Sequence, residues 1–348
     1  MSSETEVRHS GNARLSRLWS RVGGENNEGL LLMLIALLLV ITAIISPGSL
    51  TLQFAADIIR SGMVTMALAL GLLLVIISGG MDVSFTAIAI FAGYGVVSIM
   101  ARTGMDGAFW PFVAAAGVGL VLGALNAVLV AHYRMETLIA TLGTQVIFRG
   151  ILIAFIGDAY MSTLPPKLAG VGTASLFRMG GAPVSALIIP IILLTVALWY
   201  LLNRTMFGRS VFAIGGNKES ARRIGIRVSR VQVGIYLLAG TLAGAAGMMH
   251  VALSQHASPF ELVGTELNVI AAVVIGGASD AGGRGSVKGT IYGVVLVSLL
   301  QNSLVRLGIS SYWHVFVIGA VILFAVAVQA RAAARQATMG KILEEIEV

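Results

Sequence analysis

Apolar runs of roughly span length alternate with short polar stretches along most of the chain. We interpret ten of these runs as membrane-spanning helices: Gly29–Ser46, Ser61–Ser78, Ser84–Met100, Pro111–Val130, Thr137–Ile156, Val184–Leu202, Val231–Leu253, Val263–Ile275, Val287–Val305 and Tyr312–Gln329. Most of them approach the ~20 residues that cross ~30 Å of hydrocarbon. The run Val263–Ile275 is shorter and bounded by glycines. It predicts a half-helix, or a helix that starts deeper in the bundle.

Basic residues between the runs predict the orientation. With ten spans starting inside, seventeen of the 23 Lys and Arg residues fall on one side. Five fall on the other side, namely Arg60, Arg102, Lys167, Arg178 and Arg306. Because cytoplasmic loops are enriched in basic residues, both termini are expected in the cytoplasm. The tails are then residues 1–28 and 331–348, and residues 29–330 form the membrane domain.

Composition excludes most other classes. Hydrophobic residues make up 57% of the chain and charged residues 11%, whereas a soluble domain carries about 25% charged residues. We therefore expect an all-α integral membrane protein. The absence of cysteine excludes disulfides and thiolate chemistry. The net charge of +7 fits basic residues held at the cytoplasmic side better than a nucleic-acid partner.

Small residues recur at four-residue spacing within the apolar runs. No hydrophobic driving force joins helices in lipid, so close backbone approach through small residues supplies van der Waals contact instead. We expect three glycine pairs to mark helix–helix contacts: Gly119 and Gly123, Gly240 and Gly244, Gly289 and Gly293.

Residues 203–230 form a basic, glycine-punctuated island with seven Lys and Arg residues. Within it, Asn217 is a plausible N-cap, Lys218–Ile224 contains no helix breaker, and Gly225 can take the left-handed position after a helix. A short charged helix of this kind suits docking of a soluble partner. The alternative is a solvated loop that touches lipid headgroups.

The chain carries no recognisable catalytic or nucleotide-binding motif. A phosphate-binding loop needs Gly-Lys-Ser/Thr, and the sole Gly-Lys pair, Gly340-Lys341, is followed by Ile342. The glycine cluster Gly276–Ser286 lacks that lysine and is interpreted as a flexible re-entry between helices. The five histidines lack zinc-type spacing. We expect a protein that is not an enzyme by itself, without a metal site.

Several polar side chains lie in or at the ends of the predicted spans. Ionisable groups inside a bilayer are costly and face the bundle interior or a water-filled route. The candidates for a translocation pathway are Asp82, Asn126, Gln145 and Asn268. Asp82 is equally suited to cap the following helix near Ser84. Arg149, in mid-span, should pair with a carboxylate or with helix carbonyls, and Asp158 is too far along the same helix.

The longest outer loop is residues 157–183, with three prolines and five glycines. Such a composition favours turns over a long helix. A rigid external loop of this length suits a docking surface for a periplasmic partner, although an ordinary connection is the alternative.

Four stretches, in order, resemble the membrane permeases of ribose-type ABC importers, which also serve xylose, arabinose and related compounds. They are GGMDVS (79–84), ATLGTQVIFRG (140–150), FGRSVFAIGGNKESARRIGI (207–226) and ELNVIAAVVIGGASDAGGRGSVKGTIYG (266–293). Each stretch alone is weakly specific, but together they span most of residues 61–329. The chain departs from the family pattern at Phe85-Thr86, Thr265 and Asn268. The transported solute therefore need not be ribose, and deoxysugars, polyols and autoinducer-2-like furanoses stay open.

The resemblance implies a bacterial inner-membrane protein that pairs with a second permease chain, identical or not. It implies ATPase subunits on the cytoplasmic face and a periplasmic solute-binding protein outside. No cofactor is expected in this chain, since ATP and Mg²⁺ would bind the ATPase. The resemblance gives the island the role of ATPase coupling, through Asn217, Lys218, Glu219, Ser220, Ala221, Arg222, Arg223 and Gly225.

Two other functions stay open on the residues alone. A secondary transporter or facilitator for a similar solute would work alone. If proton-coupled, it would need a carboxylate in mid-span, whereas Asp82 and Glu266 lie near span ends. A membrane scaffold without transport would need no polar residues facing the interior, and Asn126, Gln145 and Asn268 argue against it.

Overall fold

A computed structural model describes residues 28–310, 313, 316–317, 319–320 and 323. The first helices are α2 (Glu28–Ile45), α3 (Leu52–Ile77), α4 (Phe85–Thr103), α5 (Trp110–Ala127) and α6 (Thr137–Ile151). The π-helical turns η1 (Val128–His132) and η2 (Leu152–Ile156) continue α5 and α6. The predicted tails and most of the predicted span Tyr312–Gln329 lie outside the described residues.

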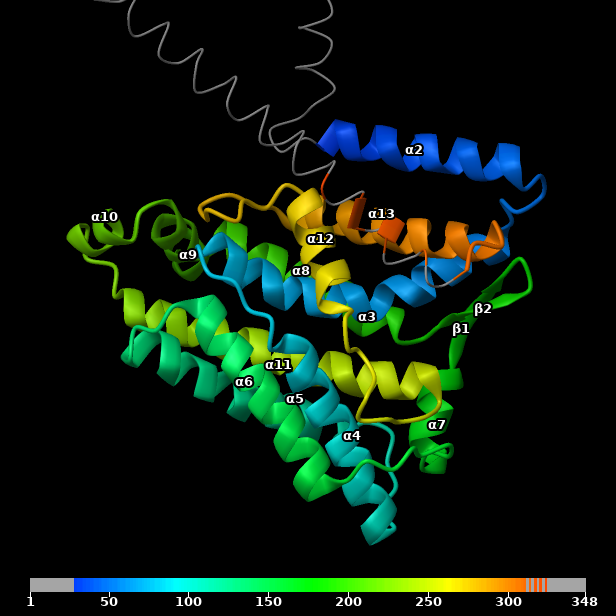
Figure 1. The fold of residues 1–348 in the computed structure, drawn as a ribbon, viewed down its shortest axis with the longest axis horizontal. Coiled ribbons are helices and arrows are strands. Elements are labelled where there is room, and N and C mark those ends of the chain that lie inside the picture. Colours follow the sequence, from blue (N-terminus) through cyan, green and yellow to red (C-terminus); the bar gives the residue numbers. More distant parts are fainter. Residues whose placement is uncertain (1–27, 311–312, 314–315, 318, 321–322, 324–348) are drawn as a thin grey trace, which may run out of the picture.

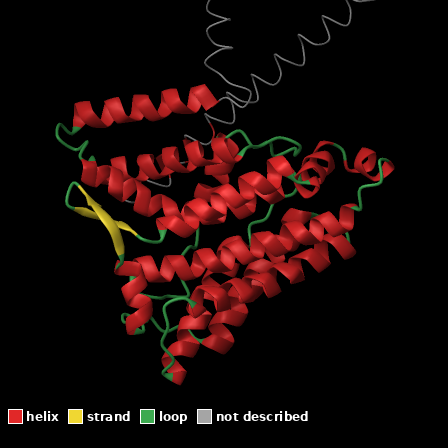
Figure 2. Ribbon diagram, turned by 180° about the vertical axis from the view of Figure 1, so that it is seen from behind, coloured by secondary structure: helices red, strands yellow, loops and turns green. Residues whose placement is uncertain are grey.

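The second half begins with the short helix α7 (Pro166–Thr173) and a hairpin of β1 (Ser175–Met179) and β2 (Ala182–Ser185). It continues with α8 (Ile188–Arg204), α9 (Met206–Gly216), α10 (Lys218–Arg223), α11 (Val228–Ser254), α12 (Glu266–Ile275) and α13 (Val287–Arg306). The α9–α10 segment and the hairpin with α7 lie at opposite ends of the molecule (Figures 1 and 2).

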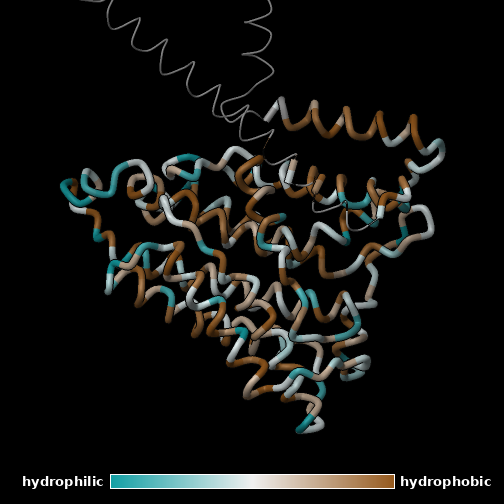
Figure 3. Tube along the Cα trace, in the orientation of Figure 1, coloured by the Kyte–Doolittle hydropathy of each residue, from teal (hydrophilic) through white to brown (hydrophobic). Residues whose placement is uncertain are grey.

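Helices occupy nine of the ten predicted segments in the described part of the chain. In the part of the chain that the structure describes, five spans are long and apolar enough to cross a membrane: α3, α4, α5 with η1, α6 with η2, and α11. A sixth is the pair α8 and α9, if these two helices, bent by 71°, form one broken span. The predicted short segment is the ten-residue helix α12. Hydrophobic residues follow the long helices, and hydrophilic ones gather around α10 (Figure 3).

The structure differs from the predicted boundaries in three places. Helix α3 begins at Leu52, so Arg60 lies in a helix and not in an outer loop. The loop 157–183 has no long helix, as expected, but it contains the eight-residue helix α7 and most of a β-hairpin, paired from Ser175–Ser185 to Met179–Ala182. The island contains the additional helix α9. That helix forms because Val211 and Ile214 share one buried face, which the glycines and arginines around them obscure in the sequence.

Helix α11 lies at the centre of the bundle and packs against α5, α4 and α3 (Figure 1). Its contact with α5 depends on glycines. A Cβ on Gly119 would lie 2.1 Å from the carbonyl oxygen of Gly240, and a Cβ on Gly244 would lie 2.1 Å from that of Ala115. The backbones of the two helices therefore touch directly, as predicted for this pair of motifs.

The third glycine pair has the same role between α12 and α13. A Cβ on Gly289 would lie 1.9 Å from the Gly276 oxygen, and one on Gly293 would lie 1.9 Å from the Ala272 oxygen. The short helix α12 is thereby held close to α13. The predicted use of Gly289 and Gly293 in helix packing is confirmed.

We predict that Gly119→Ala lowers the stability of the folded protein and that Gly117→Ala does not. The added methyl group at 119 collides with backbone, and overpacking of this kind costs about 1–3 kcal/mol. At 117, in the same helix, nothing lies within 4 Å of an added Cβ, so the change from glycine to alanine is expected to be neutral or favourable. Thermal unfolding of both variants in detergent checks this. Equal midpoints would contradict the close-packing interpretation.

Candidate functional site

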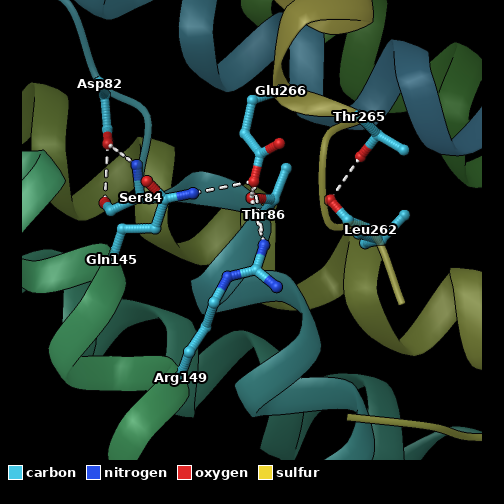
Figure 4. Close-up of polar contacts among 8 residues, drawn as sticks. All are labelled: Asp82, Ser84, Thr86, Gln145, Arg149, Leu262, Thr265 and Glu266. Atoms are coloured by element: carbon cyan, nitrogen blue, oxygen red, sulfur yellow. Dashed lines mark hydrogen bonds and ion pairs between the residues drawn. The ribbon is translucent and has the colours of Figure 1, made fainter. Parts of the chain in front are cut away.

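A cluster of polar side chains lies inside the bundle, where α4, α6 and α12 meet (Figure 4). The guanidinium Nη2 of Arg149 lies 2.9 Å from Oε1 of Glu266. The same carboxylate oxygen accepts hydrogen bonds from Thr86 Oγ1 at 2.6 Å and from Gln145 Nε2 at 2.8 Å. Three donors from two other helices thus converge on one oxygen of Glu266, which is 9% exposed.

The sequence positions these groups through ordinary helix geometry. Gln145 and Arg149 are four residues apart in α6 and therefore project from the same face. Glu266 is the first residue of α12, where the positive end of the helix dipole favours an anion. Thr86 lies in the first turn of α4. The pairing predicted for Arg149 is confirmed, and its partner is Glu266.

Sequence reasoning did not select Glu266 as a site residue, because it lies at the end of a predicted span. Two signals together point to it. Arg149 in mid-span requires a counter-charge, and the short segment that contains Glu266 cannot reach across the whole bilayer. A helix that begins inside the bundle places its first residue at depth, where Arg149 can reach it.

A second polar network orders the start of α4. Asp82 Oδ1 accepts from both the backbone N–H and the hydroxyl of Ser84, each at 2.7 Å. Asn126 Nδ2 donates to Ser84 Oγ, also at 2.7 Å. Asp82 is 2% exposed and Asn126 is fully buried. These two candidate pathway residues therefore lie together and fix the turn between α3 and α4. Asp82 holds Ser84, the N-cap residue of α4, and does not itself cap the helix.

Asn268, the fourth candidate, lines a different space. A cavity of about 460 Å³ lies between α3, α11, α12 and α13. Its polar lining residues are Asp57, Arg60, Ser61, Thr65, His250, Ser254, Thr265, Asn268, Gln301 and Asn302. Some of these side chains also join the surrounding helices. Asn302 Nδ2 of α13 donates to Ser61 Oγ of α3 at 2.9 Å, and Arg60 Nη2 of α3 donates to the Leu253 oxygen of α11 at 2.8 Å. Uncharged hydrogen-bonding groups dominate this lining.

The loop between α11 and α12 closes one side of this cavity and is tied down by Glu261. Its two carboxylate oxygens lie 2.8 Å from His250 Nε2 and 2.5 Å from His256 Nε2. Burial alone would raise the pKa of Glu261, but the hydrogen bonds and charges of the two histidines outweigh it and lower that pKa. A carboxyl with a lowered pKa contributes stability that is lost as the pH falls through its folded-state pKa.

At the opposite end of the bundle, α10 has the predicted architecture. Asn217 Oδ1 accepts from the Ser220 backbone N–H at 2.8 Å, which makes Asn217 the N-cap. Gly225 follows the helix with φ +88°. Ala221 is 2% exposed and packs with Ile214 and Val228. The helix is therefore anchored to α9 and α11, while the neighbouring charged side chains of α10 are exposed.

Two glycine turns meet the glycine-containing end of α9. The Gly283 N–H donates to the Ile77 oxygen at the end of α3, at 2.8 Å. A Cβ on Gly215 would lie 1.8 Å from that same oxygen, and one on Gly282 would lie 2.7 Å from the Cα of Gly79. The backbone of α9 thus touches both the end of α3 and the glycine loop that joins α12 to α13. We call this contact of Gly79, Gly215, Gly282 and Gly283 the glycine junction.

Comparison with known proteins defines the family. The profile of the family described as branched-chain amino acid transport system / permease component matches residues 54–326. The chain belongs to this permease family. Together with the apolar helices, this makes the permease a multi-pass membrane protein.

The relatives of this permease include two ribose import permease proteins named RbsC. That of Escherichia coli K12 is 36% identical over 299 residues, which cover 85% of this chain and 92% of the relative. That of Bacillus subtilis 168 is 36% identical over 304 residues, 83% of this chain and 88% of the relative. The predicted resemblance to ribose-type permeases is confirmed.

A second group of relatives carries a different name. The autoinducer 2 import system permease protein LsrC of Yersinia pseudotuberculosis (strain YPIII) is 32% identical over 299 residues, 86% of this chain and 83% of the relative. No solved structure is detectably similar to the permease.

We predict that Glu266→Ala and Arg149→Ala each lower the amount of folded protein in the membrane. Removing one partner of a buried ion pair leaves an uncompensated charge and costs about 3–5 kcal/mol. The matched control is Asp57→Ala, which breaks the more exposed Arg306–Asp57 pair of 3.0 Å; a surface pair is worth about 0–1 kcal/mol. Fluorescence-detected size exclusion after heating measures all three variants.

Loss of uptake with unchanged folded protein in Arg149→Ala would contradict a structural role for the pair. It would indicate that Arg149 and Glu266 act on the solute or on a moving step instead.

Proposed function

We propose that this chain is the permease subunit of an ATP-driven importer for a small polyhydroxylated solute, a sugar or a sugar-like molecule. Its setting is the bacterial inner membrane, with ten spans and both termini in the cytoplasm. A second permease chain completes the pathway, and a periplasmic binding protein delivers the solute to the end that carries loop 157–183. ATP and Mg²⁺ bind a partner ATPase, and this chain itself needs no cofactor.

The observation that carries the proposal is that one bundle contains both a polar cavity and, at one end, the short charged helix α10. Asn268, Gln301 and Asn302 offer both donors and acceptors to the cavity. Such amide groups suit hydroxyl-rich solutes, which present both functions at every carbon. The relatives named for ribose and autoinducer 2 import support the same class of solute.

The island connects the proposed ATPase contact at α10 to the membrane helices. Helix α10 is too short to be stable alone and holds its shape through its cap and the buried Ala221. Its neighbour α9 ends in the glycine junction, against α3 and the α12–α13 loop. A movement of α10 can therefore be transmitted through these direct backbone contacts to the helices that line the cavity. We assign ATPase coupling to Asn217–Arg223 with Gly225.

A stand-alone secondary transporter is the second candidate, because Glu266 is a carboxylate buried among the spans. A proton-coupled carrier needs an acid that can exchange protons during the cycle. Glu266 instead accepts three hydrogen bonds, one from a guanidinium. These bonds tie the Glu266 carboxylate to α4 and α6, which favours a structural role for it, and the ATP-driven function is therefore preferred.

Reconstitution tests the proposal directly. We expect liposomes that contain the permease alone to show no uptake of ribose, other pentoses or polyols. Adding the cognate ATPase and solute-binding protein should give uptake that needs internal ATP. Omitting the binding protein is the control for leakage. Uptake by the permease alone, driven by a solute or proton gradient, would establish the secondary transporter instead.

We further predict that Ala221→Pro leaves the permease inserted but abolishes co-purification of the ATPase. Proline removes the N–H that donates to the Asn217 oxygen at 2.9 Å and costs ~3 kcal/mol inside a helix. The matched control is Met206→Pro at the first position of α9, outside the coupling residues, where proline is tolerated and the preceding Thr205 is already extended. Normal ATPase association of Ala221→Pro would rule out coupling through α10.

A further inference from the structure

A basic cleft lies beside α10, on the side facing the start of α11. It has a volume of about 700 Å³ and is formed by the turn after η1, by α10 and by the first residues of α11. Six of its lining residues are basic or imidazole side chains, and none is acidic: His132, Arg134, Lys218, Arg222, Arg227 and Arg230. We call these residues and the space between them the basic cleft.

Most positive charges of this cleft have no ion-pair partner among the described residues. The exception is Arg222, which lies 3.6 Å from Glu219 in an exposed pair. Glu136 and Glu219 line a neighbouring pocket that shares Arg134 and Lys218 with the cleft. Burial, followed by repulsion from Arg222 and Arg134, lowers the pKa of Lys218. Like charges gathered at one place raise the free energy of the folded protein unless an anion joins them.

The start of α11 adds to this imbalance. Arg227 immediately precedes the helix and Arg230 lies in its first turn, with no acidic residue in that turn. The N-terminus of a 27-residue helix carries partial positive charge, which disfavours cations and favours anions. Two arginines at this position therefore oppose the local field. A bound anion would satisfy both the arginines and the helix.

The surroundings identify the kind of anion. Next to the cleft, Tyr133 is 66% exposed and Val128 47% exposed. Exposed apolar side chains continue from there along α5 and α6, at Val121, Leu125, Ile139, Leu142 and Val146. A tyrosine between a charged rim and an apolar surface is typical of a membrane–water interface. This combination of a basic cleft with neighbouring exposed apolar side chains is the one expected where lipid headgroups meet acyl chains.

We propose that the basic cleft binds the phosphate headgroup of an anionic phospholipid of the cytoplasmic leaflet, with the acyl chains along the exposed faces of α5 and α6. Planar guanidinium groups match phosphate oxygens in a bidentate geometry. The leaflet assignment rests on the orientation given above, whereas binding itself does not require that the chain transport anything. Occupied in this way, the cleft would brace α10 from the membrane side while its other face stays free.

The test is a lipid titration of the purified full-length chain followed by native mass spectrometry. The probes are phosphatidylglycerol, phosphatidylcholine and inorganic phosphate. We expect phosphatidylglycerol to be retained in preference to phosphatidylcholine. Arg227→Gln with Arg230→Gln should weaken phosphatidylglycerol binding about thirtyfold, from ~1 kcal/mol per basic side chain near an anionic surface. The control pair, Lys167→Gln with Arg178→Gln, removes the same charge at the opposite end and should bind like the parent.

Other outcomes overturn the proposal. Equal retention of the two lipids, or equal losses in the cleft and control pairs, would show that no lipid site exists here. Displacement of phosphatidylglycerol by inorganic phosphate would assign the cleft to a soluble phosphate. Unchanged lipid binding with loss of the ATPase from the cleft variant would assign it to an acidic protein surface. Should the double variant fail to elute as a single species, Arg134→Gln decides the matter, with an expected loss of about fivefold.

Discussion

Direct backbone contact around α11 is the constraint on which the rest of the bundle depends. Lipid tails are as apolar as the side chains of the helices, so moving a side chain from lipid into a helix contact lowers the free energy only slightly. Helices in a membrane therefore stay together through close packing and polar contacts. Gly240 and Gly244 bring α11 against α5, and Gly247 brings it to the carbonyl of Ala89 in α4. Only at that separation can Asn126 in α5 reach Ser84 at the start of α4. The glycine contacts of α11 therefore determine whether Asn126 and Ser84 lie within hydrogen-bond distance.

The polar contacts in turn fix the short helix. Helix α12 has glycine contacts on its α13 side and the Glu266 carboxylate on its α4 and α6 side. Close backbone packing holds α12 to α13, and the ion pair and hydrogen bonds of Glu266 hold it to α4 and α6. The cavity beside Asn268 is lined by α12, α13, α3 and α11. The same α12–α13 loop meets α9 at the glycine junction. The α9–α10 segment and the helices around the polar cavity are thus connected by direct backbone contacts.

Local patterns predicted much of this architecture. The apolar runs gave the long helices, the four-residue glycine spacing gave the α5–α11 and α12–α13 contacts, and Asn217 with Gly225 gave the ends of α10. The features that could not be predicted from the sequence depend on contacts between distant parts of the chain. The pairing of Arg149 with Glu266 joins residues 117 positions apart. The hairpin and α9 are short segments whose burial is decided by the helices around them.

The length of α12 has a consequence for the barrier itself. Ten residues of helix cover ~15 Å, about half of the ~30 Å hydrocarbon thickness. The remaining depth beside it is the cavity and the loop held by Glu261. If Asn268 lies on the proposed pathway, a solute beside it would be separated from the other side by only half the bilayer thickness. A small tilt of this ten-residue helix would then be enough to change which side the solute can reach.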